Sequence, residues 1–243
     1  FHKNKYHEHC FMNSPSPQIG FDRFIHLDWA TTALRMRAGM ASIEDLWEVL
    51  DLSHNGAAAK KKTRTVLNRL WLEPRPDLVD FADRGVRIYC DGPDTTAPAL
   101  TWGMALATYP FFGRVSEIVG RLTTLQGDCS SAEVHRRMAE IYGEREGTRR
   151  MTNMILQSQE SWGAIHRLDK GRRIVRKQKT NLNGSLLGAW LAEACLRYGG
   201  RALPAVSVKS SPTIYPFNLS GSTAYLLSNS RTLELRVDSS GDQ

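Results

Sequence analysis

The chain has 243 residues, of which 41% are hydrophobic and 23% charged. These values are ordinary for a soluble protein, and no run approaches the roughly 20 apolar residues that a bilayer-spanning helix needs. We therefore expect no membrane span and no membrane partner. The formal net charge of +7 favours a polyanionic partner. The cysteines form no C-x-x-C pair, and we expect free thiols at Cys10, Cys90, Cys129 and Cys195 and hence a location in the reducing cytoplasm.

The first 20 residues are interpreted as an irregular lead-in, because they contain no apolar core of the kind that signal peptides have. Metal-ligand residue types occur there, namely His2, His7, Glu8, His9 and Cys10. No second group of ligands follows at a recognisable spacing, so a solvated tail is favoured over a zinc site. No metal and no cofactor are expected.

Helices are expected in the next segment of the chain. Residues 24–38 have apolar side chains at helical spacing, and Ser42 and Asp45 form an approximate capping box before a second helix. A third helix is expected over residues 57–72, with Val66, Leu67, Leu70 and Trp71 on its apolar face and Pro74 and Pro76 ending it. Residues 84–99 contain a strand candidate at 86–90 and are interpreted as a wing-like strand or a linker.

A second group of helices is expected further along the chain. Residues 100–127 are predicted to be mostly helical with an interruption at Pro110. Ser130 or Ser131 can cap a helix that ends near residue 143, and the turn at 143–147 leads into another helix that reaches Trp162. Residues 42–71 and 131–162 thus repeat one order: a Ser-capped helix, a Gly-containing turn, and a Thr-rich and Arg- or Lys-rich helix ending at Trp.

The positive charge is clustered. Residues 164–179 contain seven Lys or Arg against one acid, Asp169, and Lys60, Lys61, Lys62, Arg64 and Arg69 form an earlier cluster. Helices followed by a basic, hairpin-like ribbon resemble a winged helix-turn-helix, and the resemblance covers about residues 110–179. It implies that the third helix enters a major groove while the wing follows the DNA backbone or the adjacent minor groove. Segments 164–166 and 173–175 would be the wing strands, and 169–171 the tip.

The resemblance also implies which side chains meet a partner. Met151, Met154, Ile155 and Trp162 would face the core, whereas Gln159 and its polar neighbours on the helix would be available outside. Arg and Lys can neutralise phosphates, and Arg, Asn and Gln can pair with base edges. The candidate nucleic-acid-binding residues are Arg149, Arg150, Asn153, Gln157, Arg167, Lys170, Arg172, Arg173, Arg176, Lys177 and Lys179, with Lys60, Lys61, Lys62 and Arg64 from the earlier cluster.

Other functions are alternatives. Exposed arginines are commonly a solvated helix face, and winged helices also dock proteins. The aromatic groups 102–112 and 215–217 are interpreted as packed helix ends, with base stacking or partner docking as the alternative. No nucleotide-binding, metalloprotease or hydrolase motif is present, so the protein is not expected to be an enzyme.

The C-terminal part has a different composition. Residues 183–200 predict an amphipathic helix closed by Gly199 and Gly200, and residues 223–237 predict a β-hairpin with its turn at 228–230. We read no functional motif here, and an oligomer or partner interface is its expected use.

Together these patterns predict an α+β, mostly helical protein with tandem winged-helix-like units plus a C-terminal helix and β-hairpin. The expected division is a lead-in (1–20), a first helix-turn-helix-like unit (21–99), a winged-helix unit with a basic wing (100–181) and a C-terminal α+β segment (182–243). We expect a non-enzymatic subunit that binds double-stranded DNA. In overall character it is similar to accessory DNA-binding proteins of bacterial phage-defence systems such as BREX, which implies a defence or regulatory complex. A protein-bridging module, a homo-oligomer and structured-RNA binding are the alternatives.

Overall fold

The computed structural model describes residues 20–52, 56–182, 185–219, 221, 230 and 232–234. Within these residues the chain is α+β and mostly helical, as the sequence predicts. Buried hydrophobic side chains form one cluster that extends from Phe21 to Leu219. The segments that the sequence separates therefore contribute to a shared core.

Three helices form the first group: α1 (Leu27–Arg37), α2 (Ile43–Asp51) and α3 (Ala57–Leu67), the last continuing into a π-helical turn at Asn68–Leu72. The expected capping box is confirmed, because Asp45 N donates to Ser42 Oγ at 3.2 Å and Ser42 N donates to the Asp45 carboxylate at 2.6 Å. The expected apolar face of the third helix is also confirmed by complete or nearly complete burial of Val66, Leu67, Leu70 and Trp71.

The strand expected at residues 86–90 is wrong, because these residues belong to α4 (Val79–Asp91). One face of α4 buries Phe81, Ala82, Gly85 and Tyr89, a spacing of one, three and four residues that only a helix places on one side. A run of five residues was too short to distinguish the two periods. The short helical turn η2 (Pro76–Leu78) precedes α4 in the chain, and η3 (Asp94–Thr96) follows it.

The centre of the molecule is α5 (Ala97–Thr108), in which Ala97 and every residue from Ala99 to Thr108 is buried. The interruption at Pro110 is confirmed: α5 ends before Tyr109, whose backbone is extended, and α6 (Pro110–Gln126) begins at the proline. A proline suits the first position of a helix, since that N–H would have no helical partner. Helix α5 also packs against α9 (Ser185–Gly199). This helix confirms the one that the sequence predicts at residues 183–200.

A three-stranded antiparallel sheet follows α6 in the chain. Its order is β1-β3-β2, with β1 at Asp128–Ser130, β2 at Ile165–Leu168 and β3 at Arg173–Arg176. The hairpin of β2 and β3 agrees with the two strands expected in the ribbon to within two residues. The sequence did not predict β1, which at three residues is too short to show a period of two.

Two helices lie between β1 and β2 in the chain, α7 (Ser131–Tyr142) and α8 (Glu146–Ser161). Ser130 caps α7, since its Oγ accepts a hydrogen bond from Glu133 N at 3.1 Å. The turn between β2 and β3 is the short helical turn η4 (Asp169–Gly171), at the residues expected for the tip.

The remaining segments after β3 form a second, two-stranded sheet and two short helical elements around α9. Strand β4 (Thr180–Leu182) pairs in parallel with β5 (Phe217–Leu219), and between α9 and β5 lie α10 (Ala205–Lys209) and η5 (Pro212–Ile214). The hairpin expected at residues 223–237 lies almost wholly outside the described residues. Among the described cysteines, Cys90, Cys129 and Cys195 are free thiols, as expected.

The first group of helices is tied to the end of α8 through the segment that precedes α1. Ile25 N donates to Ser158 Oγ at 2.9 Å, and the Trp162 indole N–H donates to Ile25 O at 2.9 Å. Leu27 N donates to Ser161 Oγ at 3.1 Å. These buried and part-buried hydrogen bonds fix where α1 to α3 lie relative to α8.

Candidate nucleic-acid interface

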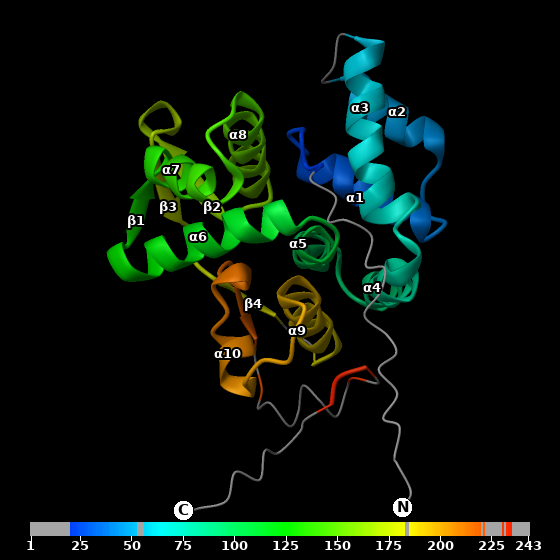
Figure 1. Ribbon diagram of the computed structural model, residues 1–243. Coiled ribbons are helices and arrows are strands. Elements are labelled where there is room, and N and C mark those ends of the chain that lie inside the picture. The colour runs from blue at the N-terminus through cyan, green and yellow to red at the C-terminus, as the bar shows by residue number, and fades with distance from the viewer. Residues whose placement is uncertain are drawn as a thin grey trace, which may run out of the picture.

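The elements that carry the candidate residues share one side of the molecule. In Figure 1 the beginning of α3, the beginning of α8 and the turn between β2 and β3 all lie at the top of the view, while α9 and α10 lie below the centre. A helix N-terminus carries partial positive charge, so α3 and α8 both have on this side the end that favours binding of an anion. The two basic clusters of the sequence, about a hundred residues apart, therefore belong to the same side.

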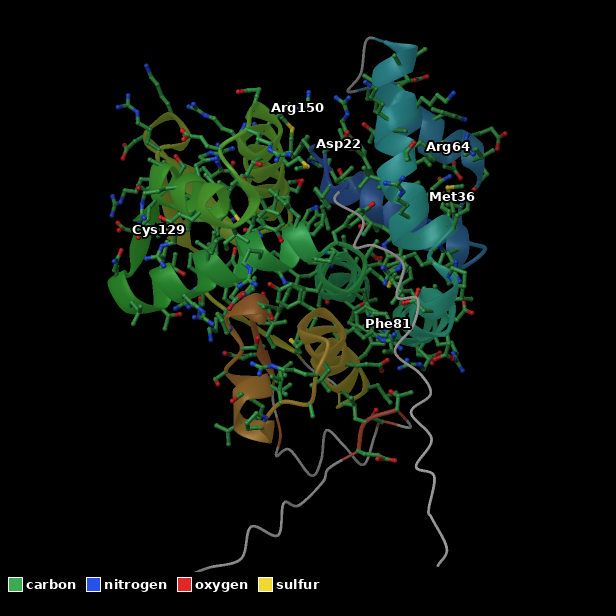
Figure 2. All side chains as sticks on the ribbon, in the orientation of Figure 1. Asp22, Met36, Arg64, Phe81, Cys129 and Arg150 are labelled. Carbon is green, nitrogen blue, oxygen red and sulfur yellow. The ribbon has the colours of Figure 1, made fainter. Side chains whose placement is uncertain are left out.

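Arg149 and Arg150 lie in the first two turns of α8, and both side chains are exposed. Figure 2 shows Arg150 near the upper end of this helix. One and two turns further along the helix, Asn153 and Gln157 are only partly buried. Because residues three, four and seven positions apart share a helix face, these polar side chains form one continuous surface. Arg149, Arg150, Asn153 and Gln157 are thus brought together as the sequence predicts.

The turn of the hairpin presents further cations. Asp169 and Lys170 have φ of 52° and 58°, and Gly171 has φ of 84°, so three consecutive residues adopt left-handed backbone. That geometry makes a tight turn and leaves Lys170 and the following Arg172 exposed. Lys179, beyond β3, is exposed as well. Although its side chain is exposed, neighbouring groups remove part of its water, and this desolvation, followed by the charge of Arg176, lowers the pKa of Lys179 from its usual value.

Other cations of the ribbon hold the hairpin in place. Arg173 Nε donates to the Asp128 carboxylate at 2.6 Å, which joins β3 to β1. Arg176 Nη1 donates to Thr124 Oγ1 at 3.2 Å, which joins β3 to α6. Lys177 is partly buried. Arg173 and Arg176 are therefore partly occupied by contacts within the protein.

Arg167 turns toward α8. Its Nη2 donates to Asn153 Oδ1 at 2.9 Å, and its backbone N–H donates to Glu160 Oε1, also at 2.9 Å. The hairpin is in this way fastened to the outer face of the helix at two points. The sequence did not reveal this contact, since nothing in the local pattern pairs residues in a strand with residues in the preceding helix.

Gln159 was expected to be available to a partner, and that prediction is wrong. Its side chain is fully buried: Nε2 donates to Ser116 Oγ at 2.9 Å, and Oε1 accepts from the Tyr215 hydroxyl at 3.0 Å. It lies one turn after Ile155 on the inner face of α8, where a polar side chain needs buried partners. Of the residues expected in the core, Ile155 and Trp162 are buried, whereas Met151 and Met154 are partly exposed.

The earlier basic cluster is divided by its contacts. Lys60 forms an ion pair with Asp51, and the Arg64 guanidinium lies 5.3 Å from the centroid of the Trp47 ring. Lys61 and Lys62 have exposed side chains. No strand occurs among the described residues before Asp128. The group of α1 to α3 therefore has no wing in the described part of the chain.

A groove between α7 and α8 combines both signs of charge. The cations of the groove are Arg136, Arg145 and Arg149, its acids are Glu140, Glu144 and Glu146, and His135 also lines it. Burial lowers the pKa of His135, and the charges of Arg149 and Arg167 lower it further. The His135 Nδ1 atom is buried without a hydrogen-bond partner. Because the acids offset the arginines, this groove is less suited to a polyanion than the outer face of α8.

The aromatic groups belong to the core, which confirms their interpretation as packed helix ends. Trp102 and Tyr109 are fully buried, and the Trp102 ring centroid lies 5.1 Å from that of Phe112 and 5.4 Å from that of Tyr215. Buried rings have no face on which a base could stack.

No family model, curated protein or solved structure matches this chain. Within the described residues, no helix combines the length and apolar character that a membrane span requires. The His- and Cys-containing lead-in at residues 1–19 lies outside the described residues.

Proposed function

We propose that this protein binds double-stranded DNA without catalysing a reaction, and that residues 110–179 act as a winged helix. The observation that carries the proposal is the order of elements: α6, β1, α7, α8, then a basic hairpin of β2 and β3 in one antiparallel sheet. A winged helix-turn-helix has this order, and its third helix lies in the major groove. In the proposal α8 is that helix and the hairpin is the wing.

The outer face of α8 has the side chains that base recognition needs. Arg149, Arg150, Asn153 and Gln157 share that face and retain exposed surface. Arginine pairs with guanine through two donors, while asparagine and glutamine offer both a donor and an acceptor. The position near the helix N-terminus also brings the backbone close to phosphates.

The hairpin and α3 supply contacts with the phosphate backbone. Lys170, Arg172 and Lys179 are exposed on or next to the hairpin, and Lys61 and Lys62 are exposed on α3. Each phosphate that a cation neutralises releases counterions, which makes binding strongly dependent on salt.

A bacterial phage-defence or regulatory complex in the cytoplasm is the proposed setting.

A protein-bridging role is the second candidate. It is favoured by the mixed-charge groove between α7 and α8, because a surface with both Arg and Glu side chains complements a protein better than a nucleic acid. The measurement below separates the two functions.

The test compares Lys170→Ala/Arg172→Ala with Arg87→Ala/Arg201→Ala, a matched pair of exposed cations on α4 and after α9. Fluorescence anisotropy on a short duplex at several salt concentrations gives affinity and salt slope. We expect the first variant to bind every duplex more weakly and to flatten the slope by up to about two units, because two phosphate contacts are lost. The control variant should bind like the parent. Arg173 and Arg176 are left intact because they join β3 to β1 and α6.

Circular dichroism and thermal melting establish that both variants are folded. If the two variants have the same affinity and slope, the hairpin does not contact DNA. If the parent binds no duplex even at low salt, the DNA-binding function is wrong and the protein-bridging role takes its place.

A further inference from the structure

The contact between Arg167 and Asn153 fixes the orientation of a side chain on the outer face of α8. Arg167 Nη2 donates to Asn153 Oδ1 across 2.9 Å. A guanidinium has five N–H donors and no acceptor, so it can meet the amide only at the oxygen. The assignment of oxygen and nitrogen in Asn153 is therefore dictated by chemistry. Its NH2 group points away from Arg167.

The hairpin holds Arg167 in this position. The backbone N–H of Arg167 is bound to Glu160 Oε1, and the turn closes over the guanidinium, since a Cβ built on Gly171 would lie 2.8 Å from Arg167 Nη2. Arg167 Nε is buried and has no hydrogen-bond partner. A guanidinium enclosed by the turn and bound to α8 is poorly placed for a phosphate and well placed to orient Asn153.

We propose that Arg167 is a positioning residue that makes Asn153 a donor, so that the base read by Asn153 is guanine; this inference rests on the DNA-binding function proposed above. Guanine presents two acceptors, N7 and O6, in the major groove, whereas thymine presents one acceptor, O4, beside its methyl group; the two acceptors favour guanine for an NH2 group. Adenine presents N7 and a donor at N6, and pairing with both would require Asn153 Oδ1 to accept a second hydrogen bond while it is held by Arg167. Cytosine presents only a donor. Arg149 and Arg150, also donors only, lie one turn earlier on the same helix and favour guanine at neighbouring positions.

The experiment selects bound duplexes from a pool with a randomised central segment and sequences them. For the parent we expect a position at which guanine is enriched. Asn153→Ala should lose that enrichment, by about tenfold at that position only. Asn153→Asp keeps an acceptor for Arg167 but has no donor, so the preference at the same position should change from guanine to cytosine, whose N4 donates.

Arg167→Met tests the positioning role itself. It keeps an unbranched side chain but removes the donors, which frees the amide to turn and pair with adenine. We expect the ratio of guanine to adenine at the Asn153 position to fall by about tenfold while the other positions are unchanged. Arg172→Met is the matched control on the exposed part of the hairpin, and it should weaken all duplexes alike without changing any preference. Circular dichroism verifies that each variant is folded.

Three outcomes overturn the inference: adenine enriched at that position by the parent, guanine retained there by Asn153→Ala, or a ratio of guanine to adenine that Arg167→Met leaves unchanged. A parent that retains no duplex from the pool at low salt contradicts the proposed function instead, and the inference with it. The two failures are thus distinguishable.

Discussion

At the scale of single residues, the close contact of α5 and α9 depends on Gly103. A Cβ on this residue would overlap with the indole of Trp190. The indole cannot move aside easily, because it is stacked on Phe81 with ring centroids 4.2 Å apart and its N–H donates to Phe81 O at 2.9 Å. Trp190 is nearly completely buried. The absence of a side chain at Gly103 is therefore a packing requirement.

Gly103→Ala should accordingly lower the free energy of unfolding by about 1–3 kcal/mol, since inserting a methyl group into a packed core displaces its neighbours. Gly147→Ala is the control, because Gly147 is in the first turn of α8 and a Cβ there would meet nothing within 4 Å. That change should raise stability by about 0.4–1 kcal/mol, because alanine loses less backbone entropy in a helix. Urea denaturation followed by circular dichroism measures both. Equal stability of parent and Gly103→Ala would show that the indole has room to shift.

At the scale of elements, Gln159 joins α8 to α6 and to Tyr215, the residue that follows η5. Its amide donates to Ser116 Oγ and accepts from the Tyr215 hydroxyl, and all three side chains are buried. Burial raises the pKa of Tyr215 well above its usual value, so the hydroxyl remains a neutral donor that needs an acceptor. The back of α8 is thereby fixed to the core while its outer face stays open.

Gln159→Leu should destabilise the protein by about 1–3 kcal/mol, because it preserves the side-chain size but leaves the buried Tyr215 hydroxyl without an acceptor. Gln157→Leu, two residues away on the partly exposed side, should change stability by no more than about 0.5 kcal/mol. Thermal and urea unfolding compare the two. The bridging role of Gln159 is wrong if both variants are equally stable.

At the scale of the whole molecule, the hydrogen bonds from Ile25, Leu27 and Trp162 fix α1 to α3 against the end of α8. Figure 1 shows the beginnings of α3 and α8 on the same side. If both contact one duplex, the binding site is longer than that of a single helix-turn-helix.

Lys61→Ala/Lys62→Ala should therefore weaken binding more on a duplex of about two helical turns than on one of roughly one turn, or about 10 base pairs. On the longer duplex the salt slope should flatten by up to about two units. Anisotropy titrations on both lengths measure this, with Arg87→Ala/Arg201→Ala as the charge-matched control. An unchanged slope on the longer duplex would place α3 outside the interface.

Much of the local structure followed from local signals. Ser42 with Asp45 marks a helix start through hydrogen bonds within three residues, and Pro110 marks another through its missing donor; the structure confirms both. The hairpin turn at Asp169–Gly171 was located for the same reason. The strand expected at residues 86–90 failed because so short a run fits both periods, and the rest of α4 was needed to decide.

The sequence by itself determined the helices other than α4 and α10, the caps at Ser42 and Ser130, and the concentration of charge, because these depend on residues close together in the chain. Only the tertiary structure decided which polar side chains remain outside. Gln159 and Gln157 are the same residue type on one helix, yet Gln159 has Ser116 and Tyr215 as distant partners in the core and Gln157 does not. Likewise, Arg167 reaches Asn153 only because the hairpin folds back onto α8. Burial and hydrogen-bond partners are set by packing between distant segments, and no local pattern encodes that packing.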